Sequence, residues 1–339
     1  MNRRLQLVLI ICVVVSVTAI VSHSLISWLK IETTFGRHWV LGRETYAVPV
    51  FMAGSSLAGD GLSWKVIGDA LDLRIEGWGV AGSSPSEWEH FQHQTTHTKL
   101  MVIVVSAYDL NEYFLSDFRA EIAPLGQTIR DLWQSRADWP LCKRLLSLYP
   151  LTYLRMLFPT AGRSDGVMVG VRERIKNALR TFSPIETEAG PTLSLNESAN
   201  TPGYKKERIS EWDSGRTLRR LSNMRSASQG KHRFNGPKKL AFLRMLLQAQ
   251  KQGQVVVVVL PVSPYYAGEF LTADVKQEFE EVMVEEQRAV QQACWIRLDQ
   301  LDALNSNDYF WDLVHMNIYG QQIATEAFIS HVRKVSKLL

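Results

Sequence analysis

The stretch that decides the fold is LMVIVV at residues 100–105, an unbroken apolar run that follows Lys99 and ends at Ser106. A strand that is apolar throughout, without alternation, is buried on both faces, which is typical of a parallel sheet. The run VVVVVL at residues 255–260 repeats the pattern. We therefore expect two central strands of a mainly parallel sheet that helices cover on both faces.

Shorter segments predict the rest of this fold. A helix should begin at Ser84, because Ser at the N-cap, Pro85 at the first helical position and Glu87 at the third form a helix-start signal. Further strands are expected at residues 48–53, 71–76 and 295–298, and further helices at residues 238–252, 273–293 and 318–334. Alternating strands and helices predict an α/β fold, a three-layer sandwich with a mainly parallel central sheet.

The alternation stops over about residues 115–237, which we interpret as an insertion in a domain that spans residues 48–339. Residues 125–160 are apolar and predicted to be helical. Residues 184–237 are polar and rich in Ser, Asn, Gly and Pro, and we expect them to be irregular or mobile.

The N-terminus predicts where the chain is located. Arg3 and Arg4 precede 25 uncharged positions that end before Lys30. About 20 apolar residues span a bilayer, and the Arg pair predicts a cytoplasmic N-terminus. We expect residues 1–30 to be a single-pass signal anchor in the cytoplasmic membrane and residues 31–47 a linker, with the domain facing the periplasm or exterior. A cleaved signal peptide is the alternative, although residues 19–24 fit a cleavage site poorly.

Charge and composition restrict the remaining classes of function. The 339 residues have 46% hydrophobic content and a net charge of only +4, which favours a globular protein over a disordered chain. Residues 205–239 carry eleven Lys and Arg against three acidic residues. They form either a solvated loop or a surface that attracts an anionic polymer or lipid headgroups.

Nucleic acid is not an expected partner on the exported side. Cys142 and Cys294 are either two free thiols or a disulfide pair.

Asp312 and His315 are the strongest chemical signal. An Asp three residues before a His, just ahead of a helix, can hold an imidazole in one tautomer as a general base. A nucleophile for this base is Ser56 in GSSL, residues 54–57, at the carboxyl end of the first predicted strand. Ligand sites of open α/β sheets lie at that edge. The three residues together predict serine acyl transfer.

Two more turns at the same edge offer donors for an oxyanion. Gly79 in the Gly-rich turn after the second predicted strand can present a backbone N–H. The turn after the third strand contains Tyr108 and Asn111. A separate group with i, i+3 and i+7 spacing could hold zinc or form a solvated helix face, and we expect the solvated face and no metal; it consists of His90, His93 and His97.

The order of these segments resembles the SGNH, or GDSL-type, hydrolase family. Its Gly-Asp-Ser-Leu block is similar to residues 54–57, its Gly block to Gly79, and its final Asp-x-x-His block to Asp312 and His315, followed by Asn317 and Gly320. The resemblance covers about residues 48–110 and 250–335. It implies Ser56 as nucleophile, His315 as base, Asp312 as its orienter, and the backbone N–H groups of Ser56 and Gly79 as oxyanion donors, with no cofactor.

Two residues depart from the family pattern. Ser55 stands where the family has Asp, and Tyr108 stands where the third block has the Asn that donates to the oxyanion. Either Asn111 or Tyr108 supplies that hydrogen bond, or the site is weakened, since losing one such donor costs roughly two to three decades of rate.

A membrane anchor before such a domain is similar to alginate O-acetyltransferase-like proteins and to exported proteins of teichoic-acid D-alanylation. The resemblance implies an esterase or acyltransferase that acts on acyl, chiefly acetyl, esters of a cell-surface polysaccharide or other envelope polymer. A membrane-bound O-acyltransferase would then be a partner, and transfer could depend on it. The alternative is a non-catalytic scaffold or polymer-binding component of an envelope polysaccharide assembly.

Overall fold

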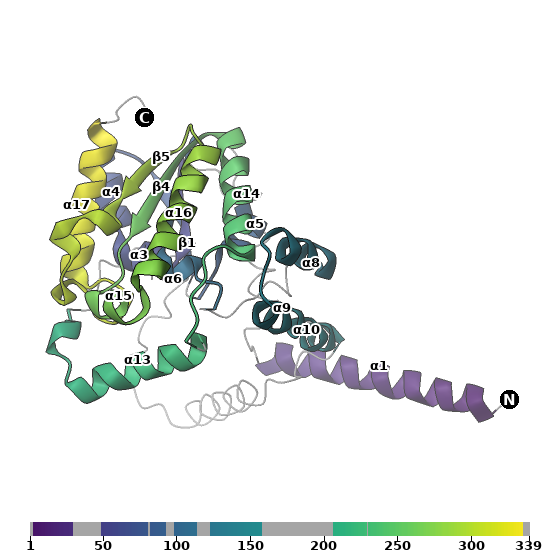
Figure 1. Cartoon of the computed structure of the whole chain (residues 1–339). Coiled ribbons are helices and arrows are strands. Elements are labelled where there is room, and N and C mark those ends of the chain that lie inside the picture. The colour runs from purple at the N-terminus through teal and green to yellow at the C-terminus, as the bar shows by residue number, and fades with distance from the viewer. Residues whose placement is uncertain are drawn as a thin grey trace, which may run out of the picture. The chain divides into compact units, whose positions relative to one another are not determined.

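The computed structural model describes residues 3–29, 49–80, 82–92, 98–113, 123–157, 206–228 and 230–334. The chain divides into two compact units. One comprises Met1–Gly42 with Lys143–Thr192, and the other comprises Arg43–Cys142 with Leu193–Leu339. The second unit holds the α/β core (Figure 1), and its residue ranges include all the predicted site residues.

The core of the second unit is a five-stranded sheet with the order β2-β1-β3-β4-β5, and every neighbouring pair is parallel. Its strands are β1 (Val50–Ser55), β2 (Ile75–Val80), β3 (Leu100–Ser106), β4 (Gln254–Leu260) and β5 (Cys294–Arg297). β1 and β3 are buried throughout, and β4 is buried except at Gln254. The apolar runs therefore form the centre of a parallel sheet, as predicted.

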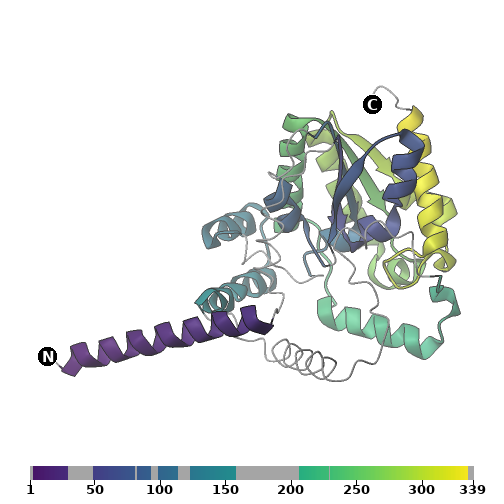
Figure 2. The ribbon, with the colours of Figure 1, turned by 180° about the vertical axis from the view of Figure 1, so that it is seen from behind.

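Helices cover both faces of this sheet, which is compatible with a three-layer sandwich (Figures 1 and 2). Contacts join α17 with α3 and α4 in one group, and α14 with α5 and α16 in the other. The bounds are α3 (Ser56–Gly61), α4 (Trp64–Leu71), α5 (Pro85–Phe91), α14 (Pro237–Gln252), α16 (Ala273–Ala289) and α17 (Ile318–Lys334). Short helices at the strand ends are α6 (Ala107–Leu110), α15 (Pro264–Phe270), η3 (Leu298–Gln300), η4 (Asp302–Leu304) and η5 (Asn307–Tyr309).

The predicted start of α5 is confirmed. Pro85 is its first residue, and the Glu87 carboxylate accepts a hydrogen bond of 3.0 Å from the N–H of Ser84. This bond satisfies a donor that the helix itself leaves without a partner. His90 lies in α5, whereas His93 and His97 lie outside the described residues.

The second strand begins later than predicted. Residues 71–74 end α4 and form a turn, with Asp72 in the left-handed region at φ 53°. β2 then runs through the glycines that we expected to form a turn, and Gly79 lies inside the strand. The physical reason is close approach to β1, because a Cβ on Gly77 would overlap the carbonyl oxygen of Met52.

The middle region is more helical than predicted. The helices α8 (Leu125–Gln134), α9 (Trp139–Leu146) and α10 (Leu148–Leu157) confirm the helical prediction for the residues described there. After η2 (Ile209–Glu211), the 15-residue helix α13 (Ser214–Ser228) lies where we predicted irregular chain, so that prediction was wrong. Leu221 and Met224 of α13 pack against the hydrophobic core. Residues 184–205 lie outside the described part.

The first unit contains α1 (Arg3–Leu29), a 27-residue helix. Several of its apolar side chains are exposed, including Ile10, Val14 and Ile20. Among the helices that the structure describes, none combines the length and apolarity needed to cross a bilayer. The predicted linker at residues 31–47 lies outside the described part. Cys142 and Cys294 are free thiols and do not form a disulfide with one another.

Candidate active site

The turn from β1 into α3 exposes the predicted nucleophile. Ser55 is the N-cap of α3, and its hydroxyl accepts a hydrogen bond of 3.2 Å from the N–H of Leu57. A Cβ on Gly54 would lie 2.7 Å from both Ala58 Cβ and the carbonyl oxygen of Val104, so glycine lets β1 pack closely against α3 and β3 here. Ser56, the first helical residue, is partly exposed at the carboxyl end of β1.

A short loop carries the predicted base and its orienting carboxylate. Phe310 and Met316 form an antiparallel bridge, and the N–H of Trp311 donates to the carbonyl oxygen of His315 at 3.1 Å. We call residues 310–316 the clip. Phe310, Met316 and two residues between them, Leu313 and Val314, are buried in the hydrophobic core. This apolar anchoring fixes the backbone that carries Asp312 and His315.

The structure brings Ser56, His315 and Asp312 together as a hydrogen-bonded chain. Ser56 Oγ lies 2.8 Å from His315 Nε2. His315 Nδ1 lies 3.0 Å from each carboxylate oxygen of Asp312. This order of hydroxyl, imidazole and carboxylate is the geometry of a serine nucleophile with its base and orienter.

The clip also stabilises the charge of Asp312, whose side chain is only 4% exposed. Its Oδ1 accepts hydrogen bonds from the backbone N–H groups of Val314 at 2.9 Å and His315 at 2.8 Å. Burial raises the pKa of Asp312, but the His315 ring and these two amides outweigh burial and hold the pKa below its ordinary value. Asp312 therefore stays ionised while it orients the imidazole.

Asn317, directly after the clip, joins η5 to α17 and to the segment before α13. Its side-chain amide donates to the carbonyl oxygens of Asp308 at 2.7 Å and Glu207 at 3.2 Å. Its side-chain oxygen accepts from the N–H groups of Tyr319 and Gly320, each at 3.1 Å. Asn317 is fully buried, so these four bonds satisfy a polar group that would otherwise be costly to bury.

The backbone around Gly79 is tightly packed against the nucleophile helix. Gly79 pairs with Gly54 of β1, and a Cβ on Gly79 would lie 3.2 Å from the nitrogen of Gly59 in α3. A larger residue would push β2 away from α3. The position supports a role near Ser56, while the donation of the Ser56 and Gly79 N–H groups to an oxyanion stays a prediction.

Tyr108 and Asn111 differ in their surroundings. Burial, followed by the charges of Asp109 and Asp312, raises the pKa of Tyr108 to about 12, so its hydroxyl keeps its proton. The Asn111 side-chain oxygen accepts hydrogen bonds from the backbone N–H groups of Tyr113 at 3.1 Å and Arg233 at 3.2 Å. Tyr108 is thus electrostatically coupled to the triad carboxylate, whereas these bonds give Asn111 a structural role in its loop.

Two residues that the sequence did not reveal contact the triad. The indole of Trp311 stacks on the imidazole of His315, with ring centroids 5.1 Å apart and planes 15° apart. Arg220 Nη2 of α13 lies 3.8 Å from Asp312 Oδ2. An aromatic residue beside the Asp-x-x-His block could have suggested the first contact. The second depends on how α13 packs, which no local pattern reports.

Most cations of the basic segment that the structure describes have partners. Arg216 pairs with Glu207, Arg225 with Glu269 and Lys239 with Glu285. Lys238 is buried, and its ammonium donates to the carbonyl oxygen of Asn111 at 2.7 Å. The loop part of the earlier interpretation is therefore wrong, because residues 214–228 form a helix, whereas the side chains of Arg216, Arg220 and Arg225 are about half-exposed to solvent.

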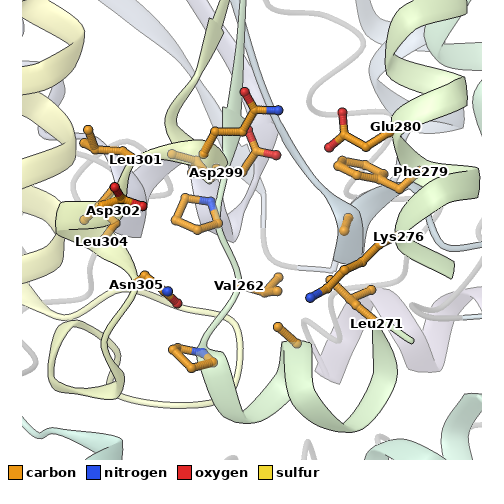
Figure 3. A pocket seen from close by; sticks show the side chains of 16 residues that line it. Val262, Leu271, Lys276, Phe279, Glu280, Asp299, Leu301, Asp302, Leu304 and Asn305 are labelled. Carbon is orange, nitrogen blue, oxygen red and sulfur yellow. The ribbon is translucent and has the colours of Figure 1, made fainter. Parts of the chain in front are cut away.

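A cavity of about 380 Å³ opens at the carboxyl ends of β4 and β5. Lys276 of α16 and Asn305 reach into it from opposite sides (Figure 3). Ala267 of α15 also lines it, and the neighbouring Tyr266 meets Tyr108 edge to face with ring centroids 6.1 Å apart. The cavity thus lies at the edge of the sheet that carries the triad. In the described part of the chain, no three His, Cys, Asp or Glu side chains are grouped so as to hold a metal ion.

Comparison of the whole chain with protein-family models and with the curated proteins finds no match in either set. The triad is therefore supported by its own geometry, namely the 2.8 Å contact of Ser56 with His315 and the 3.0 Å contacts of His315 with Asp312. The SGNH family assignment stays a prediction based on the order and content of the motifs.

Proposed function

We propose that this chain is an SGNH-type serine esterase or O-acyltransferase with a flavodoxin-like three-layer core. The observation that carries the proposal is the hydrogen bond between Ser56 Oγ and His315 Nε2, with Asp312 on the other ring nitrogen. A weak nucleophile such as Ser becomes reactive when a base lies within hydrogen-bonding reach and a third group orients that base.

The geometry supports a two-step acyl transfer. In the first step Ser56 Oγ bonds to the acyl carbonyl carbon while its proton passes to His315 Nε2, and the imidazolium is stabilised by Asp312. The bond to the leaving alkoxide then breaks, and that oxygen takes the proton from His315. In the second step the oxygen of water or of a sugar hydroxyl bonds to the acyl carbon and gives its proton to His315. The bond from that carbon to Ser56 Oγ then breaks, and Ser56 takes the proton back from His315, which regenerates the free hydroxyl.

The substrate class and location in this proposal come from the motif resemblance. The acyl group is chiefly acetyl, and its carrier is a cell-surface polysaccharide or other acylated envelope polymer. The protein would be held at the cytoplasmic membrane by its N-terminal helix, with its catalytic domain in the periplasm or exterior. A membrane-bound O-acyltransferase would supply acyl groups if the reaction is transfer.

A fluorophosphonate probe tests the nucleophile directly, because it bonds covalently to activated serine hydroxyls. We expect labelling of the full-length protein and loss of labelling in Ser56→Ala and His315→Ala. Asp312→Asn should reduce the labelling rate by about three to four decades, since the imidazole loses its correct tautomer. Intact-mass spectrometry, with peptide mapping to Ser56, measures each result.

Ser222→Ala is the matched control, because Ser222 is an exposed hydroxyl on α13 that should not affect labelling. Labelling at another serine, or equal labelling of Ser56→Ala, would contradict the proposed nucleophile. Release of acetate from an acetylated oligosaccharide, compared with its transfer to an unmodified one, distinguishes esterase from transferase.

A scaffold without catalysis is the second candidate. It is favoured by Tyr108, which stands at the family's Asn position, so that the side-chain amide that donates to the oxyanion in the family is missing there. A scaffold would bind the polymer without any serine labelling. Polymer binding that is equal in the unaltered protein and in Ser56→Ala, together with no labelling in either, would support it.

A further inference from the structure

Trp311 covers one face of the imidazole that serves as base in the proposed reaction. Its ring lies 5.1 Å from the His315 ring, and the two planes differ by only 15°. The imidazole side chain is 18% exposed. Its two nitrogens are already directed at Ser56 and Asp312. The stack therefore adds a third constraint, perpendicular to the two in-plane hydrogen bonds.

The backbone pairing of the clip places Trp311 and His315 opposite one another and so favours their stacking. The N–H of Trp311 donates to the His315 carbonyl at 3.1 Å, directly inside the bridge between Phe310 and Met316. Residues opposite one another in an antiparallel bridge have neighbouring side chains on the same face. Phe310 and Met316 are both almost completely buried, so the core holds the two ring-bearing positions in register.

We propose that Trp311 is a positioning residue for the His315 base, an inference that rests on the proposed acyl transfer. Two in-plane hydrogen bonds allow the imidazole to tilt about the line that joins its partners, and a stacked indole opposes that tilt. The indole face also attracts the imidazolium that forms as Ser56 loses its proton, because the π-face of Trp favours a nearby cation. The stack thus favours proton transfer by orientation and by charge.

The other charged and titratable groups around His315 lie on the clip, on α13 and on α6. Asp312 lies on the clip and binds His315 Nδ1. Arg220 of α13 lies 3.8 Å from Asp312. Tyr108 of α6 is coupled electrostatically to Asp312 and Arg220. Substituting Trp311 by another uncharged residue leaves all of these charges in place, so a change in rate reports on the indole.

The test compares Trp311→Leu and Trp311→Phe with the unaltered full-length protein. We expect Trp311→Leu to slow fluorophosphonate labelling of Ser56 about tenfold, because small misplacements of reacting groups cost up to two decades. Trp311→Phe should restore most of the rate, since it keeps an aromatic face. In Trp311→Leu the acid limb of the rate–pH profile should move to lower pH, because the imidazolium loses its π partner.

Trp133→Leu is the control for loss of an indole elsewhere. Trp133 lies on α8 and is 83% exposed, so its loss should leave the labelling rate unchanged. NMR of the His315 ring protons provides a readout that does not depend on activity. A stacked indole shifts these protons upfield, so Trp311→Leu should move them downfield in a protein that remains folded by circular dichroism.

The outcomes separate this inference from the proposed function. Normal labelling of Trp311→Leu with an unchanged pH profile would overturn the positioning role alone. An equal loss of rate in Trp311→Leu and Trp311→Phe would also overturn it, because only the indole's bulk in the fold would then matter. No labelling of the unaltered protein would overturn the proposed function together with this inference.

Discussion

Asp109 is a fully buried carboxyl group that links the first and third strand ends. Its Oδ2 accepts hydrogen bonds from the N–H and the hydroxyl of Ser106, each at 2.9 Å. Burial is the largest influence on Asp109 and raises its pKa from 3.8 to about 6, although Ser55, Ser106 and the charge of Lys238 act in the opposite direction. Ser55 directly precedes Ser56, so the protonation of Asp109 changes a hydrogen bond beside the proposed nucleophile.

This raised pKa predicts a pH-dependent stability. The folded chain binds the Asp109 proton more tightly than the unfolded chain does, so this group's contribution to the free energy of unfolding falls as pH rises from 3.8 to about 6. Asp109→Asn removes that dependence. Between about pH 3 and pH 7, the variant should therefore gain roughly 3 kcal/mol relative to the unaltered protein.

Urea unfolding at several pH values measures this difference, which does not depend on any constant cost of the substitution. Asp302→Asn, at an exposed carboxyl, is the control. A difference between Asp109→Asn and the unaltered protein that stays constant with pH would contradict the prediction.

At the level of single residues, the sequence predicted the triad because each of its residues occurs in a short recognisable motif. Ser56, Asp312 and His315 each stand in a fixed local context, and parallel strands bring their carboxyl ends to one edge. Trp311 and Arg220 could not be predicted in the same way. Their contacts depend on the bridge of the clip and on the packing of a helix, and both are tertiary features.

The helix α13 is the element whose packing most affects the site. Leu221 packs against the hydrophobic core, and Arg220 beside it lies 3.8 Å from Asp312. The segment before α13 is held to the clip, because the N–H of Ile209 donates to the carbonyl oxygen of Phe310 at 2.8 Å. A loosely packed α13 would therefore weaken the surroundings of the orienting carboxylate.

Two leucines on α13 allow a matched test of this packing. Leu221→Ala should destabilise the helix by about 1–2 kcal/mol, below the range for fully buried leucines because Leu221 is half-buried. Leu218→Ala, at a side chain that is 66% exposed, should have little effect. Hydrogen–deuterium exchange of residues 214–228 measures both. Equal exchange in the two variants would show that Leu221 does not hold α13 in place.

The sequence predicted the boundaries of helices and strands correctly where the hydrophobic pattern was strong. The predictions failed where tertiary packing determines the boundary. The apolar runs of β3 and β4 were recognised because continuous burial leaves a continuous apolar sequence. The start of β2 was misplaced because its glycines serve close strand pairing instead of a turn, as the space around Gly77 shows. α13 was missed because its mostly polar sequence carries only a narrow apolar face.

For the whole molecule, we predict association with a membrane. We expect the full-length protein to sediment with membranes and to resist extraction by alkaline carbonate, because residues 5–29 carry no charged side chain. Removal of residues 1–30 should release the protein into the soluble fraction. Complete extraction of the full-length protein by carbonate would contradict the anchor.

The hydroxyl of Ser56 and the imidazole of His315 are separated by 259 positions in the chain. During synthesis the proposed nucleophile emerges early, whereas its proposed base arrives almost at the end. A nascent or prematurely terminated chain that stops before residue 310 would contain the serine turn without any group to activate it. On the proposed function, activity therefore requires that translation has passed the clip and that the clip has folded against the turn from β1 into α3.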